Sequence, residues 1–300
     1  MAGKAVHRVE WQTISLIILV YLGFLGATAW LAAASLWVAV PVTGVLIALY
    51  SSLEHEVTHG HPTDSEWINA AVIFPSLNPM VPYLRFRDTH LAHHMDSRLT
   101  DPYDDPESAF LDQGDWVRLP SWVRSLLNLN NTLAGRLVLG PLIGQAMFMA
   151  ADWKLISAGD RRVLIGWLLH IPAVAPVLWW VWQSPMPVWS YLVATYIGLA
   201  ILKVRTFAEH QAHELTRGRS VIIEDRGPLA FLFLNNNLHI VHHMHPKLPW
   251  YALPARYRAG RKRYLDLNGG YRFRSYGELF RRHMFRAKDP VPHPLWQRSP

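Results

Sequence analysis

Histidines are the residues best suited to chemistry, because most of the 16 fall into tight groups. The groups share helical spacing and comprise His55 and His59; His90, His93 and His94; and His239, His242 and His243. Side chains three or four positions apart lie on one face of a helix, so each group can direct two or three imidazoles to one point. Imidazole suits iron, zinc, copper and nickel, and each ion takes about four to six donors. Eight converging histidines therefore exceed the needs of one metal ion and suit a pair.

The first group also has to be compared with two other metal motifs. The run from His55 to His59 is a literal HExxH, the signature of zinc peptidases. An intramembrane zinc protease needs a further ligand, usually an acid, but residues 163–202 contain no Asp or Glu, and the two later groups would have no role. A ferritin-like carboxylate site needs two ExxH motifs and two more glutamates, and only Glu56 to His59 fits. The pattern favours a histidine-bound metal pair, with an HExxH protease and a non-catalytic metal-transport or sensing protein as alternatives.

Two long stretches without charge must position these histidines. Residues 11–53 form 43 consecutive positions without Asp, Glu, Lys or Arg, and residues 163–202 form 40 more. A single helix of 40 residues would be roughly 60 Å long, about twice the hydrocarbon thickness of a membrane. Each stretch therefore predicts a helical hairpin, broken near residues 32–36 in the first and at the two prolines of residues 184–187 in the second.

The resulting fold class is an all-α integral membrane protein with four transmembrane helices in two hairpins. The expected spans are residues 12–31, 36–53, 163–183 and 188–205 of one domain, 1–300, with a cytoplasmic helical cap from 54–162 and 206–300 that carries the metal site. An even number of crossings with charge-free turns places all 29 Lys and Arg and all 22 Asp and Glu on one face. By the positive-inside tendency that face is cytoplasmic.

Four further features of the sequence limit the interpretation. Residues 68–83 are apolar but broken by prolines, which predicts an interfacial or re-entrant segment, and residues 133–151 predict a helix in the membrane plane. Residues 247–300 hold 13 Lys and Arg against three acids, which suits either anionic lipid headgroups or an acidic electron-carrier or acyl-carrier protein. The absence of cysteine excludes disulfides, thiolate-bound iron–sulfur clusters and catalytic thiols from this chain.

The histidine groups resemble the boxes of the membrane fatty acid desaturase superfamily, which includes acyl hydroxylases and carotenoid ketolases. Those boxes read HxxxH, HxxHH and HxxHH, and the third continues here through Pro246, Pro249, Trp250 and Tyr251, similar to the HHxxPxxPWY tail of the superfamily. The segments 55–63, 99–102 and 105–108 look like a small bacterial branch that also acts on modified amino acids.

The resemblance implies two iron ions, with O2 as co-substrate, and no catalytic residues beyond the metal ligands. The implied ligands are the eight box histidines and one more before the third box: His55, His59, His90, His93, His94, His210, His239, His242 and His243. His213 is the rival of His210, and His61 and His245 are expected to lie outside the ligand set. Asn235, Asn236 and Asn237 are candidates either to hold a metal-bound water or to cap a helix. Asp101, Asp104 and Asp105 are candidates either to accept histidine N–H bonds or to be solvated acids of a loop.

The implied function is an O2-dependent oxidoreductase that introduces a double bond into an acyl chain or related aliphatic substrate by C–H abstraction. A hydroxylase or ketolase on the same scaffold is the alternative. Because this chain has no flavin, nicotinamide or haem motif, the electrons are expected from a ferredoxin or cytochrome with its reductase. The expected setting is the lipid bilayer of a bacterial inner membrane, with the site facing the cytoplasm, a substrate that could be carrier-bound, and no nucleic acid.

Overall fold

A computed structural model describes residues 9–296 of the chain, which are mostly helical. Four helical segments are long and apolar enough to cross a membrane: residues 11–34, 36–58, 161–183 and 188–209. They coincide with the four predicted spans and extend the second and fourth by a turn. The added turn carries His55 on its helix and brings His59 and His210 to the residue after a helix end.

The first apolar stretch breaks at Ser35, as expected. Helix α1 (Trp11–Gly26) continues through a π-helical turn, η1 (Ala27–Leu31), and α2 (Ala32–Ala34). Ser35 is extended, with φ −163° and ψ 114°, and α3 (Leu36–Thr58) begins after it. In the second stretch, α10 (Arg161–Gln183) ends before Ser184, and α11 (Val188–Glu209) begins directly after Pro187. Pairing of these helices into two hairpins with a cytoplasmic cap stays a prediction.

The chain forms two compact units. Unit 1 runs to Arg87 and includes Leu155–Gly198, and unit 2 comprises Asp88–Lys154 and the chain from Leu199 onward. Besides α1 to α3 and α10, unit 1 holds α4 (Glu66–Val72) and begins α5 (Tyr83–His93). Helix α11 (Val188–Glu209) begins in unit 1 and ends in unit 2. Whether residues 1–300 act as one domain stays a prediction.

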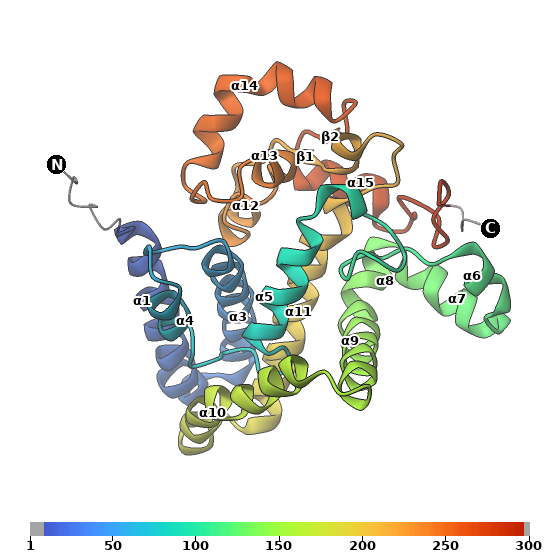
Figure 1. Cartoon of the computed structure of the whole chain (residues 1–300). Coiled ribbons are helices and arrows are strands. Elements are labelled where there is room, and N and C mark those ends of the chain that lie inside the picture. Colours follow the sequence, from blue (N-terminus) through green and yellow to red (C-terminus); the bar gives the residue numbers. More distant parts are fainter. Residues whose placement is uncertain (1–8, 297–300) are drawn as a thin grey trace. The chain divides into compact units, whose positions relative to one another are not determined.

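Glycines and tyrosines hold the apolar helices of unit 1 together, where α1 and α3 lie side by side (Figure 1). A methyl group at Gly44 of α3 would lie 2.7 Å from Ile197 of α11, and one at Gly198 would lie 2.9 Å from the Gly44 carbonyl oxygen. Tyr50 and Tyr191 donate hydrogen bonds to carbonyls of the irregular segment 73–82, which follows α4. That segment is the proline-broken stretch, and its backbone is satisfied by buried side chains as the apolar setting requires.

Unit 2 contains the remaining helices and one small sheet. In order after α5 the elements are η2 (Asp96–Arg98), α6 (Gln113–Arg118), α7 (Ser121–Asn130), α8 (Leu133–Val138), α9 (Gly140–Ser157, which ends in unit 1), η3 (Thr216–Arg219), β1 (Ile222–Ile223), α12 (Pro228–Leu232), α13 (His239–Met244), α14 (Leu253–Leu267), β2 (Arg272–Phe273) and α15 (Tyr276–His283).

The described residues are mostly helical, as the predicted all-α class requires, and they include one small sheet in which β1 and β2 pair in parallel, with the buried Ile222 opposite Arg272. One expectation is corrected here. The single helix expected over 133–151 is two helices, α8 and α9, and α9 continues to Ser157. The break comes at Leu139, directly before Gly140 and Pro141, a residue pair that disfavours an uninterrupted helix.

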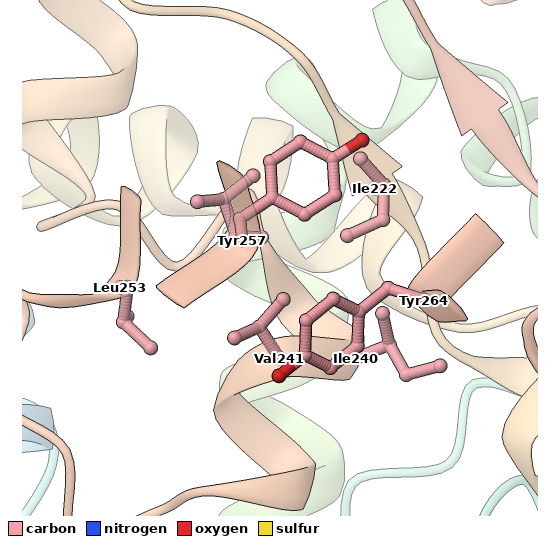
Figure 2. Close-up of a cluster of buried hydrophobic side chains, with 7 residues drawn as sticks. Ile222, Ile240, Val241, Leu253, Tyr257 and Tyr264 are labelled. Atoms are coloured by element: carbon pink, nitrogen blue, oxygen red, sulfur yellow. The ribbon is translucent and has the colours of Figure 1, made fainter. Parts of the chain in front are cut away.

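Figure 2 shows a hydrophobic cluster in unit 2 to which α13 contributes. Its members are Ile222, Leu238, Ile240, Val241, Leu253, Tyr257 and Tyr264, contributed by β1, α13 and α14 and the residue before α13. Ile240 and Val241 are fully buried. Because both lie between His239 and His242 in the sequence, burying them turns the opposite face of this short helix toward the histidine site.

Candidate metal centre

Four histidines from three parts of unit 2 meet at one point. His93 ends α5, His210 follows α11, and His239 and His243 lie on α13. Nε2 of His210 lies 2.9 Å from Nε2 of His93 and 3.0 Å from Nε2 of His239, which lies 3.1 Å from Nε2 of His243. One nitrogen of each lies within 4.8 Å of the others. We refer to these residues as the four-histidine set.

A second group, the three-histidine set, consists of His90, His94 and His242. Nε2 of His94 lies 3.0 Å from Nε2 of His90 and 3.1 Å from Nε2 of His242. His94 also stacks on His243 of the four-histidine set, with ring centroids 4.3 Å apart. In unit 2, therefore, every histidine of the second and third boxes joins one of two adjacent sets, and His210 joins the first.

The spacing of these nitrogens fits metal ligands. Donors at about 2.0–2.1 Å from one ion are roughly 3 Å apart when they occupy neighbouring coordination positions. The Nε2 separations of 2.9 to 3.1 Å in both sets match that spacing. Imidazoles that meet through the same nitrogen, five of the seven being buried, are suited to donate to a transition metal. The residues of both sets therefore fit metal ligands.

Carboxylates contact two of these rings through Nδ1, the nitrogen that faces away from the other histidines. Nδ1 of His93 lies 2.8 Å from Oδ1 of Asp105, and Nδ1 of His90 lies 2.9 Å from Oε1 of Glu107. Such partners fix the ring orientation and direct Nε2 toward a metal. Of the three predicted aspartates only Asp105 has this role. Asp101 instead accepts from the backbone N–H groups of Tyr103 and Asp104.

Glu107 was missed by the sequence prediction. Its backbone N–H donates to Oδ1 of Asp105, at 2.9 Å, so a single turn of the loop presents both acids to α5. The signal that could have found Glu107 is its place two residues after Asp105 in an acidic, proline-containing loop close to the second box.

The electrostatics differ across the site. Burial lowers the pKa of His93, but the charges of Glu107 and Asp105 outweigh it and raise the pKa to about 9. Burial likewise opposes ionisation of Glu107, whose pKa is nevertheless held well below its usual range by His90 and His93. Burial, and then neighbouring histidine charges, hold the pKa values of His210 and His239 well below normal. These two rings are therefore neutral near pH 7, which is the form that binds metal.

The asparagines beside the third box act on neighbouring groups. Oδ1 of Asn236 lies 3.1 Å from Nδ1 of His239, and its Nδ2 donates to Oε1 of Glu209 at 2.8 Å. Asn235 and Asn237 donate to backbone carbonyls. The helix-capping alternative is wrong, because the N-cap of α13 is Leu238 and no side chain caps it.

Two histidines outside the expected ligand set are engaged elsewhere in unit 2. Nδ1 of His213, the rival of His210, accepts from the backbone N–H of Leu215 at 3.0 Å. Nε2 of His245 lies 3.0 Å from the Tyr264 hydroxyl, beside the hydrophobic cluster. Neither belongs to a histidine set.

The first box lies in unit 1. His55 and His59 are buried and their ring centroids are 5.0 Å apart, so they share one face of the end of α3. Glu56 points to another group: its Oε1 lies 3.8 Å from Nε2 of His61, whose Nδ1 lies 2.8 Å from Oε1 of Glu10. The acid of HExxH is therefore engaged in a buried cluster with Glu10 and His61, which disfavours its use as the general base of a zinc protease.

Two adjacent sets of histidines, backed by carboxylates, could hold metal ions, and the four apolar helices indicate a membrane protein. The family model for fatty acid desaturase matches residues 28–275, and the chain belongs to that family. A comparison with curated proteins finds no match. Family membership implies oxidative chemistry on acyl chains at non-haem iron.

Proposed function

We propose that this protein is an O2-dependent di-iron desaturase that introduces a double bond into an acyl chain or a related aliphatic substrate. The observation that carries the proposal is that seven histidines of unit 2 converge in two sets, the four-histidine set and the three-histidine set. Six of them come from the second and third boxes, and the seventh is His210. Their nitrogens are spaced as metal ligands are. Seven imidazoles in two adjacent sets exceed what one ion binds.

We assign one iron to the four-histidine set and the other to the three-histidine set. We assign His55 and His59 to the same iron as the three-histidine set. This assignment rests on the sequence, because these two residues form the HxxxH box. With these two the ligand count reaches four and five, within the range of about four to six donors for each ion. Bound iron, together with O2, supplies the oxidising power to remove hydrogen from an unactivated C–H bond.

The contribution of the protein's own residues is orientation. Asp105 and Glu107 keep Nε2 of His93 and His90 directed into the site, and Asn236 does the same for His239. The hydrophobic cluster fixes α13, and so fixes three ligands at once. A rigid site of this kind limits which C–H bond of a bound chain is reached, and removal of a second, neighbouring hydrogen yields the alkene.

Two electrons must come from another protein, because the chain contains no cysteine for a cluster and no cofactor-binding motif. The basic C-terminal stretch, residues 247–300, would attract an acidic ferredoxin or cytochrome by charge complementarity. The metal site would then face the cytoplasm, the side that positive residues favour, in a bacterial inner membrane.

The test is iron analysis and product analysis on anaerobically purified protein. We expect about two iron atoms per chain. Supplied with a ferredoxin, its reductase and NADPH, cells or membranes containing the chain should form an unsaturated lipid or metabolite that mass spectrometry detects. His93→Ala and His242→Ala should abolish this product, whereas His213→Ala should retain it.

Isotopically labelled dioxygen distinguishes the alternative on the same scaffold. A desaturase releases the label as water, whereas a hydroxylase or ketolase leaves it in the product. Zinc at one ion per chain, with activity that needs Glu56 but survives His242→Ala, would replace the proposal with a protease. Metal binding without oxygen consumption under any donor would replace it with a non-catalytic metal protein.

A further inference from the structure

The aliphatic stems of two cationic side chains in unit 2, Lys203 and Arg136, lie over the start of α9. A methyl group added at Gly140 would lie 3.2 Å from Cγ of Lys203 and 3.5 Å from Cδ of Arg136. One turn further, a methyl group at Gly144 would lie 2.9 Å from the Lys203 amine. Gly140 and Gly144 are four residues apart and therefore form a side-chain-free strip on one face of α9, over which Lys203 lies.

In the described part of the chain, these two cations differ from nearby basic residues because neither forms an ion pair with a carboxylate. Arg205 forms an ion pair with Glu209, at 2.9 Å, and Lys288 forms one with Asp289. Within the described part of the chain, no carboxylate lies at ion-pair distance from Lys203 or Arg136. Glu107 attracts Lys203 at longer range, but its carboxylate is bound to His90. Arg136 uses Nε to donate to the Asn130 carbonyl, at 3.1 Å.

The position of this pair has a cost that an anion would relieve. Lys203 lies on α11, within one of the four helices of membrane-spanning length, and Arg136 is partly buried. Burial lowers the pKa of the Arg136 guanidinium, which reflects poor solvation of its charge. Ionisable residues in apolar helices are costly and usually mark a ligand or ion path.

We propose that Lys203 and Arg136 form a binding site for the anionic headgroup of an amphiphile, a carboxylate or a phosphate. Lys203 precedes Glu209 by six residues, so it lies roughly 9 Å along α11 from the helix end that carries His210. If the headgroup is the carboxylate of a substrate, which rests on the proposed function, the site fixes how far along the chain the attacked carbon lies. If it is a lipid phosphate, the same site anchors a bilayer lipid.

The experiment measures binding by the purified full-length protein in a neutral detergent, with native mass spectrometry. Two matched pairs of probes serve: palmitate against hexadecanol, and dioleoyl phosphatidate against dioleoylglycerol. The wild type should prefer the anionic member of at least one pair by about tenfold or more, as a charge-assisted hydrogen bond predicts. Preference within the first pair identifies a carboxylate ligand, and preference within the second identifies a lipid phosphate.

Four variants locate the site. Lys203→Met and Arg136→Met should remove the preference, and Gly144→Ala should weaken it by displacing the Lys203 amine without removing a charge. Lys203→Arg should retain it. The control is Lys154→Met, which removes an exposed lysine of the same helix α9 and should change nothing.

Absence of preference in the wild type for either pair overturns the proposal, as does a preference that survives both methionine variants. Thermal midpoints and iron content establish that each variant is folded. If Lys203→Met does not fold, the Arg136→Met and Gly144→Ala results decide. The measurement requires no turnover, so failure of the proposed oxidation leaves its outcome interpretable, and failure of headgroup binding leaves the oxidase proposal intact.

Discussion

Nδ1 of His93 and Oδ1 of Asp105 lie 2.8 Å apart, and both side chains are almost fully buried. The carboxylate therefore orients a ring whose other nitrogen meets His210. We expect Asp105→Asn to lower metal affinity about 10- to 100-fold, as loss of such a partner does at other histidine sites. Competition with a chelator measures the affinity. Asp104→Asn, which changes an exposed acid of the same loop, is the control. Equal affinities for both variants would contradict the assigned role of Asp105.

Removing one histidine of the four-histidine set should reduce the iron content of the protein. Removing a histidine close to it in the sequence, but outside the set, should not. We expect His243→Ala to lose about one iron per chain and all activity, because too few donors remain to hold the ion. His245→Ala, two residues away, contacts Tyr264 and not the sets, so it should keep its iron. Metal analysis after gel filtration distinguishes the two. Full iron content in His243→Ala would remove this histidine from the ligand set.

The hydrophobic cluster should support the metal centre through α13. Ile240 is fully buried, so Ile240→Ala should lower the free energy of unfolding by about 2–5 kcal/mol. Chemical denaturation of the purified protein measures the loss. Iron should also dissociate faster, because α13 carries three of the ligands. Leu215→Ala, at a position 69% exposed, is the matched control and should be nearly neutral. A stable Ile240→Ala protein would mean that α13 is held by something other than this cluster.

A carboxylate that is hydrogen-bonded to Tyr257 of the cluster should make stability depend on pH. Glu224 accepts hydrogen bonds from Arg261, Tyr257 and Arg272, each at 2.6 Å. Hydrogen bonding from Arg261, above all, lowers the pKa of Glu224 to about 2, against an ordinary value of 4.5. A pKa that is lower in the folded state contributes stability above the ordinary pKa, and the contribution is lost as the pH falls toward 2.

The wild type should therefore unfold at a higher temperature than Glu224→Gln, by about 2–4 °C, since a partly exposed ion pair contributes about 1 kcal/mol at most. The difference should be complete above about pH 5 and disappear toward pH 2. Thermal unfolding in detergent over that range measures it, and Glu214→Gln, at an exposed acid, provides the control. A difference that does not change with pH would show that the ionised form of Glu224 is not what matters.

Much of the site could be predicted from the sequence because its information is local. Imidazoles at i, i+3 and i+4 share a helix face wherever that helix lies, so His239, His242 and His243 had to point the same way. The four apolar helices were predictable for a similar reason, since length and the absence of charge decide whether a helix can cross a bilayer. Even the interruption near Ser35 followed from the excess length of the first stretch.

The choices between neighbours required the tertiary structure. Nothing in the sequence separates His210 from His213, which differ only in where the chain turns after α11, and His210 meets His93 across 117 positions. Likewise Asp105 and Glu107, but not Asp101, face α5 because the loop turns at Asp105. Glu56 turns toward Glu10 and His61, which local spacing could not reveal. Helical periodicity fixes direction within one segment, whereas contacts between distant segments depend on the path of the whole chain, and that path decided which side chains reach the site.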